Sequence, residues 1–473
     1  MTVLSPVSAI IPADIEAEAP LAALLKALTA LEIHCESKDF RRPAPLLAAL
    51  YELATGRPFE RHGAWPLVFG RASEAGEVTR PRRRVAWLRI DSRFGDLAMS
   101  TGRHVPLGRR LRLLPPSLCE SLSTGDAVLV LDWSHTGAAR FDTGPLEEAA
   151  MALDIPAQNI LLLTQNTAQT NPPQGHGPQV RIAHAHADLP KLWRLAFGPL
   201  VRPSEYRLPF GFALTSSERP QRFVCRNTEA TATRALIAAR LSERTEPGLI
   251  EFPRDRFVRN MPRSAAFQNE LNQVSLAGAQ LSNQSMVARF IAERRSNVGA
   301  PQTTGGTDLS PNEALAVAAW ADVQVVADRE MGFADQCHIS PELLCAVVAG
   351  TPFLSFGARG AVALLRDSGF DVHDGLVDHA YDARVAPSER LEMAFRTLED
   401  MLERQGPLSS EALANLAEAA RRNERVFRTA GIARWASAAV SAIAGLPLSE
   451  NVDERLPDLA DVPATTIPRR SLN

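Results

Sequence analysis

This sequence of 473 residues has no closely spaced cysteine pair, little net charge and no long apolar run. The five cysteines are odd in number and widely spaced, and no CxxC pair occurs among them. This pattern argues against a disulfide framework and against a zinc site, and it fits a reducing cytoplasm best. The formal charge of −3 gives the molecule no general attraction for nucleic acid or for an anionic membrane. We therefore expect no nucleic-acid partner and no metal site.

A membrane span and a secretory signal are not predicted either. No apolar run approaches the length that crosses a bilayer, and the first sixteen residues contain no Lys or Arg and are broken by Pro6 and Pro12. Hydrophobic residues make up 45% and charged residues 22% of the chain, which is ordinary for a globular protein. The length then predicts two domains in a soluble, cytoplasmic chain.

The first half of the chain contains a strand–helix–strand pattern. In "GDAVLVLDWSHTG" an apolar strand covers 127–131, and in "PLEEAAMALDIPAQNILLLTQN" an amphipathic helix leads to a second apolar strand at 160–163. Continuous apolar strands that alternate with helices predict a parallel sheet covered on both faces. Its ligand edge should lie at the carboxyl ends of the strands, near Asp132–Gly137 and Thr164–Asn166.

A second α/β series follows a proline-rich connection at about 203–220. Its predicted strands are 222–225, 322–327 and 352–356, and a helix begins near Ala232. The last of these strands is too apolar for a sheet edge, so we expect it inside the second sheet. Residues 254–310 are polar, with Asn, Gln and Ser clusters. The predicted domains are 1–205 and 215–445, followed by a flexible tail at 449–473.

Several stretches of the second half resemble a known family. "FVCRNTEATATRALIAARL", "VQVVADRE", "SPELLCAVVAGTPFLSFGARGAVALLRDSGF" and "DGLVDHAYD" are similar to the donor-binding domain of GT-B type glycosyltransferase-like proteins, in a form related to fucosyltransferases. The resemblance covers about two thirds of the chain, and much of it is apolar scaffold. It implies an α/β protein with two Rossmann-like domains that face an interdomain cleft. It also implies metal-independent transfer of a sugar from a nucleotide-sugar donor to a glycan or another hydroxyl acceptor, with no tightly bound cofactor.

One departure from the family pattern concerns the donor diphosphate. The family helix before the AG-x-P-F turn opens with Thr-Glu-Lys, whose lysine contacts phosphate, whereas this chain has Ser340, Pro341 and Glu342 there. The loop after the strand 222–225 keeps Asn227 but has Thr228 where the family has arginine. Fewer cations are therefore available for a diphosphate than in the family.

A surviving donor site would need cations and helix N-termini, because a GT-B enzyme neutralises the departing diphosphate without a metal. A carboxylate or histidine must also accept the proton of the acceptor hydroxyl in an inverting transfer. The candidate catalytic residues are Asp132, His135 and Glu330, and Arg329 is a further candidate cation. The candidate donor-binding residues are Arg226, Asn227, Arg234, Ser340, Glu342 and Gly357.

Purely structural interpretations remain open for these residues. Ser340-Pro341-Glu342 is a sufficient helix start without any ligand, and Gly357 can permit a tight turn rather than cradle a phosphate. The leading hypothesis is a glycosyltransferase. The alternative is a catalytically degenerate GT-B binding or assembly module. An active enzyme should keep at least two cationic side chains facing the cleft, and a binding module need not.

Overall fold

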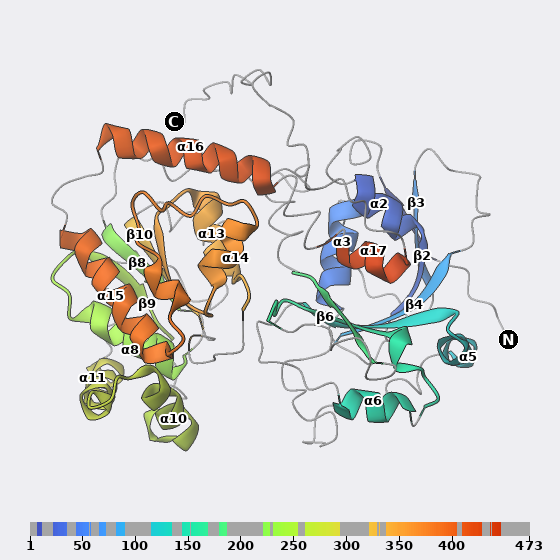
Figure 1. Cartoon of the computed structure of the whole chain (residues 1–473), viewed down its shortest axis with the longest axis horizontal. Helices are drawn as coiled ribbons and strands as arrows, with labels where there is room; N and C mark the ends of the chain where they lie inside the picture. Colours follow the sequence, from blue (N-terminus) through green and yellow to red (C-terminus); the bar gives the residue numbers. More distant parts are fainter. Residues whose placement is uncertain are drawn as a thin grey trace.

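The computed structural model describes two α/β units side by side (Figure 1). The described residues are 7–11, 22–35, 44–55, 57, 66–71, 82–89, 115–134, 144–151, 153–168, 179–186, 221–227, 230–253, 261–293, 321–328, 331, 337–403, 409–427, 436 and 438–445. His135, Thr228, Arg329, Glu330 and the tail at 449–473 lie outside them. Among the described helices, none is long and apolar enough to span a membrane.

The first unit is built on a sheet that has seven strands in the described part of the chain, in the order β1-β3-β2-β4-β5-β6-β7. Neighbouring strands pair in parallel except β2 and β3, which are antiparallel. The sheet is therefore mixed rather than purely parallel. The strands are β1 (Val7–Ile11), β2 (Leu31–Cys35), β3 (Pro66–Arg71), β4 (Arg83–Arg89), β5 (Ala127–Trp133), β6 (Ile160–Thr164) and β7 (Arg181–His184).

Strand β5 lies at the centre of this unit, and all seven of its residues are buried. Successive side chains of a strand point to opposite faces, so Val128 and Val130 join one hydrophobic cluster while Leu129 and Leu131 join another. The faces are covered by α2 (Ala22–Thr29), α3 (Pro45–Thr55), α5 (Pro116–Thr124) and α6 (Gly144–Met151). Coverage on both faces explains the continuous apolar run from which the strand was predicted.

The second unit contains four parallel strands in the order β11-β10-β8-β9 within the described residues. They are β8 (Gln221–Arg226), β9 (Gly248–Glu251), β10 (Ala321–Ala327) and β11 (Phe353–Phe356). The predicted strands 322–327 and 352–356 do pair in one sheet, with Ala327 opposite Phe356. The helices packed around them are α8 (Ala232–Ser242), α13 (Pro341–Ala349), α14 (Ala361–Asp367) and α15 (Pro387–Glu403).

Strand β11 corrects one expectation, because it is the end strand of the described sheet and not an interior one. Its four residues are nonetheless all buried. The hydroxyl of Tyr381 accepts a hydrogen bond of 2.9 Å from the Ser355 amide, so this buried strand donor is satisfied by a side chain. A sheet edge covered in this way can be as apolar as a central strand.

A helical hairpin lies between β9 and β10, in the stretch whose sequence showed only a polar composition. It consists of a short 3₁₀ helix, η6 (Met261–Arg263), followed by α10 (Ala265–Val274) and α11 (Gln280–Glu293). Phe267, Leu271 and Val274 bury one face of α10, and Val287 and Phe290 do so on α11. The apolar spacing of i, i+4 and i+7 was present in the sequence, but the many Asn and Gln residues concealed it.

The chain finally returns to the first unit. Helix α16 (Ser410–Val426) runs along the second unit beside α13, and α17 (Ala438–Ala444) packs on α2 and β7 (Figure 1). Val440 and Ile443 of α17 are fully buried in the same cluster as Leu24 and Leu28 of α2. The hydrophobic core of the first unit is thus completed by the C-terminal part of the chain.

Candidate functional site

The two units meet where the strands β6 and β7 end. The backbone N–H of Thr167, just after β6, donates to the Cys337 carbonyl at 2.7 Å, and the Asn166 side-chain oxygen accepts from the Cys337 N–H at 2.9 Å. One step further along, the His186 Nε2 lies 2.5 Å from the Ile339 carbonyl oxygen. The segment before α13 is therefore hydrogen-bonded to the carboxyl edge of the first sheet.

Histidine 338 lies inside this junction with only 4% of its surface exposed. Burial, together with the neighbouring His186, lowers the pKa of His338 to about 3. The ring is therefore neutral at physiological pH. This neutral, buried ring lies beside the three hydrogen bonds that join the two units.

At the carboxyl edge of the second sheet, the predicted donor residues of β8 are engaged with β9. The Arg226 Nε lies 2.5 Å from a carboxylate oxygen of Glu251. The Asn227 backbone N–H and side-chain amide both donate to the Glu251 carbonyl, each at 3.0 Å. The positive charge of Arg226 is therefore already paired, and the two residues fasten the ends of β8 and β9 together.

Arg234 is held at the start of α8 and is only 7% exposed. Its Nε donates to the carbonyl of Ala327, the last residue of β10, at 2.8 Å. The N-terminus of α8 is satisfied internally. Thr231 accepts from the Arg234 N–H, and one Glu270 oxygen accepts both the N–H and the hydroxyl of Thr233 at 3.0 Å. Thr233 thus anchors a carboxylate from α10.

Ser340 and Glu342 lie at the start of α13. The Ser340 hydroxyl accepts from the Leu343 N–H at 3.1 Å, and the residue is 3% exposed. Pro341 follows at the first helical position, where a missing N–H costs nothing. Glu342 is half-buried in the first turn, where its charge suits the helix dipole. The geometry matches the structural interpretation of this motif.

Gly357 follows β11 and lies against Asp328, which follows β10. A Cβ atom at Gly357 would come within 2.5 Å of a carboxylate oxygen of Asp328, so a side chain there would force Asp328 to move. The ends of β10 and β11 are therefore brought together at these two residues. Ser340, in contrast, lies on the segment bonded to the first unit.

A carboxylate fills the start of α14, which follows Gly357. One Asp382 oxygen accepts from the Ala363 N–H at 2.9 Å, and the Asp382 carbonyl accepts from the Gly360 N–H at 3.2 Å. Burial raises the pKa of Asp382.

The buried Arg390 guanidinium donates to the carbonyl of Met331 at 2.5 Å and to that of Arg384 at 2.8 Å. Burial lowers the pKa of Arg390 to about 10.

Asp132, the candidate base of the first unit, is fully buried at the end of β5. Its Oδ2 accepts from the Leu46 N–H at 2.9 Å and from the Trp87 indole at 3.2 Å. Its Oδ1 accepts from the backbone and the hydroxyl of Ser134, at 3.1 and 2.6 Å. These four bonds make Asp132 the cap of α3, which accounts for its burial without a catalytic role.

Sequence reasoning did not identify Glu270, Tyr381 or His186 as parts of this region, whereas Asn166 lies within the ligand edge that it predicted. The partner of Glu270 lies 37 residues away, and Asn166 and His186 bond to a segment more than 150 residues away. Asp382 ends the stretch "DGLVDHAYD", where an acidic residue can cap the helix that follows. The helix that Asp382 binds is instead α14, which precedes it in the chain.

Comparison with known proteins gives no family assignment, because no protein-family model, curated protein or solved structure matches the chain. Within the described residues, no group of three or more His, Cys, Asp or Glu side chains could hold a metal ion. The candidate site therefore rests on its own geometry and on the resemblance of the sequence motifs.

Proposed function

We propose that this chain is a catalytically degenerate member of the GT-B type, which uses the two-unit fold as a binding or assembly module. One observation carries the proposal: at three helix N-termini of the second unit, a side chain of the chain itself already accepts a hydrogen bond from a backbone N–H. Glu270 and Thr231 occupy the start of α8, Ser340 that of α13, and Asp382 that of α14.

The physical argument concerns the donor diphosphate. Free N–H groups and cations at helix starts are what hold a phosphate in a metal-independent site. A diphosphate at α8 or α14 would have to displace a carboxylate already in place, which would leave a negative charge close to the phosphate. Of the predicted cations in the described residues, Arg226 is paired with Glu251, and Arg234 is buried and bonded to a carbonyl. This arrangement favours the module over the transferase.

The second candidate is sugar transfer from a nucleotide-sugar donor to a hydroxyl acceptor. It is favoured by the placement of Arg234, Asp328 and Gly357 at the ends of β10 and β11, where open α/β sheets bind ligands. In that case His135, Glu330 and Arg329 would supply the proton acceptor and the additional charge.

A thermal-shift screen against nucleotide diphosphates and nucleotide sugars tests the proposal, since a ligand that binds the native state raises the melting temperature. We expect no rise for the unaltered chain at about 1 mM ligand, which is the scale of weak binding. A saturable rise with any nucleotide sugar would overturn the module and favour the transferase.

The variant Glu342→Lys makes the same screen sharper, because it puts back the cation that the family carries there. If the edge keeps its family shape, this variant gains diphosphate binding of a few kcal/mol at most. Glu411→Lys, in the first turn of α16, makes the same charge change on an exposed helix start and serves as the matched control. Equal responses of the two variants would show a nonspecific charge effect.

A further inference from the structure

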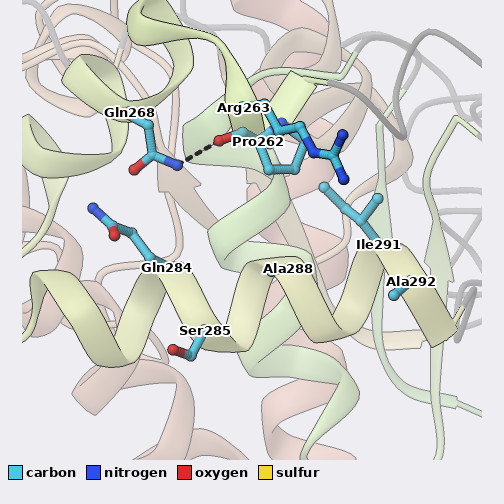
Figure 2. Close-up of a pocket in the computed structure, with 8 residues that line it drawn as sticks. All are labelled: Pro262, Arg263, Gln268, Gln284, Ser285, Ala288, Ile291 and Ala292. Atoms are coloured by element: carbon cyan, nitrogen blue, oxygen red, sulfur yellow. Dashed lines mark hydrogen bonds between the residues drawn. The ribbon is translucent and has the colours of Figure 1, made fainter.

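The hairpin α10–α11 carries an open groove with a volume of about 640 Å³ (Figure 2). One wall is α11, which presents Gln284, Ser285, Ala288 and Ile291, and the other is the segment from η6 into α10. This volume falls within the roughly 300–1,000 Å³ of ligand sites. The groove lies on the insertion between β9 and β10, and its described lining includes none of the side chains that bind the helix starts discussed above.

Primary amides define the chemistry of the groove. The Gln268 Nε2 donates to the Pro262 carbonyl at 2.5 Å, which fixes this side chain on the groove wall (Figure 2). The Gln284 amide of α11 donates to the Asn272 side-chain oxygen of the facing helix α10, at 3.3 Å. An amide side chain offers a donor and an acceptor together, which matches the N–H and C=O of a peptide backbone.

A cation lines the groove, and an exposed apolar side chain lies one helical turn beyond its lining residues. Arg263 is exposed beside Ile291, and within the described residues it makes no salt bridge. Leu281 lies one turn before Gln284 and Ser285 on α11, hence on the same helix face, and is 78% exposed. An exposed leucine in line with a polar groove is a natural apolar anchor for a partner.

We propose that this groove binds an extended peptide segment of a partner protein, with a hydrophobic side chain at Leu281 and an acidic side chain at Arg263. From Leu281 to Ile291 the helix rises about 15 Å. An extended chain covers this distance in about four to five residues at roughly 3.3 Å each. The partner motif is therefore a hydrophobic residue and an acidic residue about four to five positions apart, with the carboxylate paired to the guanidinium.

A peptide fits this groove better than a sugar or a nucleotide does. Among the described residues, the lining contains no aromatic side chain on which a sugar ring or a base could stack. It offers one guanidinium, which suits a single carboxylate better than a diphosphate. The proposal rests on the module function above and names the class of partner that such a module would hold.

Fluorescence anisotropy with synthetic peptides tests the inference on the full chain. The probe is a labelled Ser/Thr peptide that carries Leu and Glu about four residues apart. We expect saturable binding, which weakens at least tenfold in Arg263→Glu and at least threefold in Leu281→Ser. A probe with Lys in place of Glu should bind Arg263→Glu better than it binds the unaltered chain. Ala288→Arg, which fills the groove from the helix, should abolish binding.

Arg396→Glu is the matched control, because it makes the same charge change on an exposed position of α15 and should leave binding intact. Circular dichroism confirms that each variant is folded. No saturable binding up to about 1 mM, equal binding by all variants, or displacement of the peptide by a soluble oligosaccharide would each overturn the proposal. Nucleotide binding by the unaltered chain would overturn the module function instead, so the two failures are distinguishable.

Discussion

Single side chains in the second unit are tied into buried hydrogen-bonded chains, and Tyr381 is at the centre of one. Its hydroxyl accepts from the Ser355 N–H at 2.9 Å and lies 2.9 Å from His379 Nδ1. The His379 Nε2 lies 2.8 Å from the Val372 carbonyl, which can only accept, so Nε2 carries the proton and Nδ1 accepts from the hydroxyl.

The variant Tyr381→Phe removes this hydroxyl while keeping the ring. The Ser355 N–H and His379 Nδ1 are then left buried without their partner, so we expect the free energy of unfolding to fall by about 1–3 kcal/mol. Urea denaturation measures the change. Ser282→Ala, which removes a hydroxyl that donates to the Ala279 carbonyl at the surface, should cost almost nothing. Equal losses for the two variants would contradict the account.

Buried histidines should make the protein sensitive to mild acid. Burial lowers the pKa of His338 to about 3 and that of His373 to about 4, and it also lowers those of His34 and His379. The unfolded chain therefore binds more protons below its ordinary histidine pKa of about 6.5, so stability is complete above that pH and falls as the pH drops. The raised pKa of Asp382 offsets part of this loss.

At about pH 5, His338 and His373 should each lower the free energy of unfolding by about 2 kcal/mol relative to neutral pH. Denaturation curves at the two pH values measure the sum. His373→Asn should remove about half of the contribution of this pair, and asparagine tolerates the positive φ of 66° at this position. The same pH dependence in this variant would exclude His373 as a source.

At the scale of an element, the cap of α13 should stabilise more than the cap of α16. Ser340 and Ser409 are both N-caps whose hydroxyl accepts at 3.1 Å, from Leu343 and Ala412 respectively, but Ser340 is buried and Ser409 is exposed. Water can replace the hydroxyl only at Ser409. We expect Ser340→Ala to cost about 1–2 kcal/mol and Ser409→Ala about 0.5 kcal/mol. Thermal denaturation of the pair measures the difference, and the reverse order would refute the argument.

At the scale of the whole molecule, the two units should unfold together. One buried cluster includes residues of both, and Thr167, Asn166 and His186 bind the second unit directly. Hydrogen exchange followed by mass spectrometry should give β5 and β10 the same free energy of opening within about 1 kcal/mol. Asn166→Ala should lower both values together. Clearly separate openings of the two strands would show that the seam does not couple them.

The sequence predicts the elements of this fold better than it predicts their neighbours. The strands at 127–131, 160–163 and 322–327 are apolar runs buried on both faces, so local pattern alone identifies them. The antiparallel pairing of β2 with β3 depends on long-range contacts that no local pattern encodes. The same holds for β11, whose covering residue Tyr381 lies 26 positions away.

The sequence predicts at which strand ends some candidate residues lie, but not which residues they contact. Gly357 and Asp328 do meet at the ends of neighbouring strands, as parallel topology requires. Asp132 ends its strand as predicted, but its partner is the N–H of Leu46, 86 residues earlier, and only the folded chain shows that it caps a helix. Whether His135 and Glu330 take part in chemistry stays a prediction.

The docking of α17 on α2 has a consequence for biosynthesis. Leu24 and Leu28 are translated long before Val440 and Ile443, which cover them. Part of the apolar surface of the first unit therefore stays open while the residues between them are synthesised. At about 5–20 residues per second this interval lasts roughly 20–80 seconds. A nascent chain of this kind is a natural client of the chaperones that shield exposed hydrophobic surface during translation.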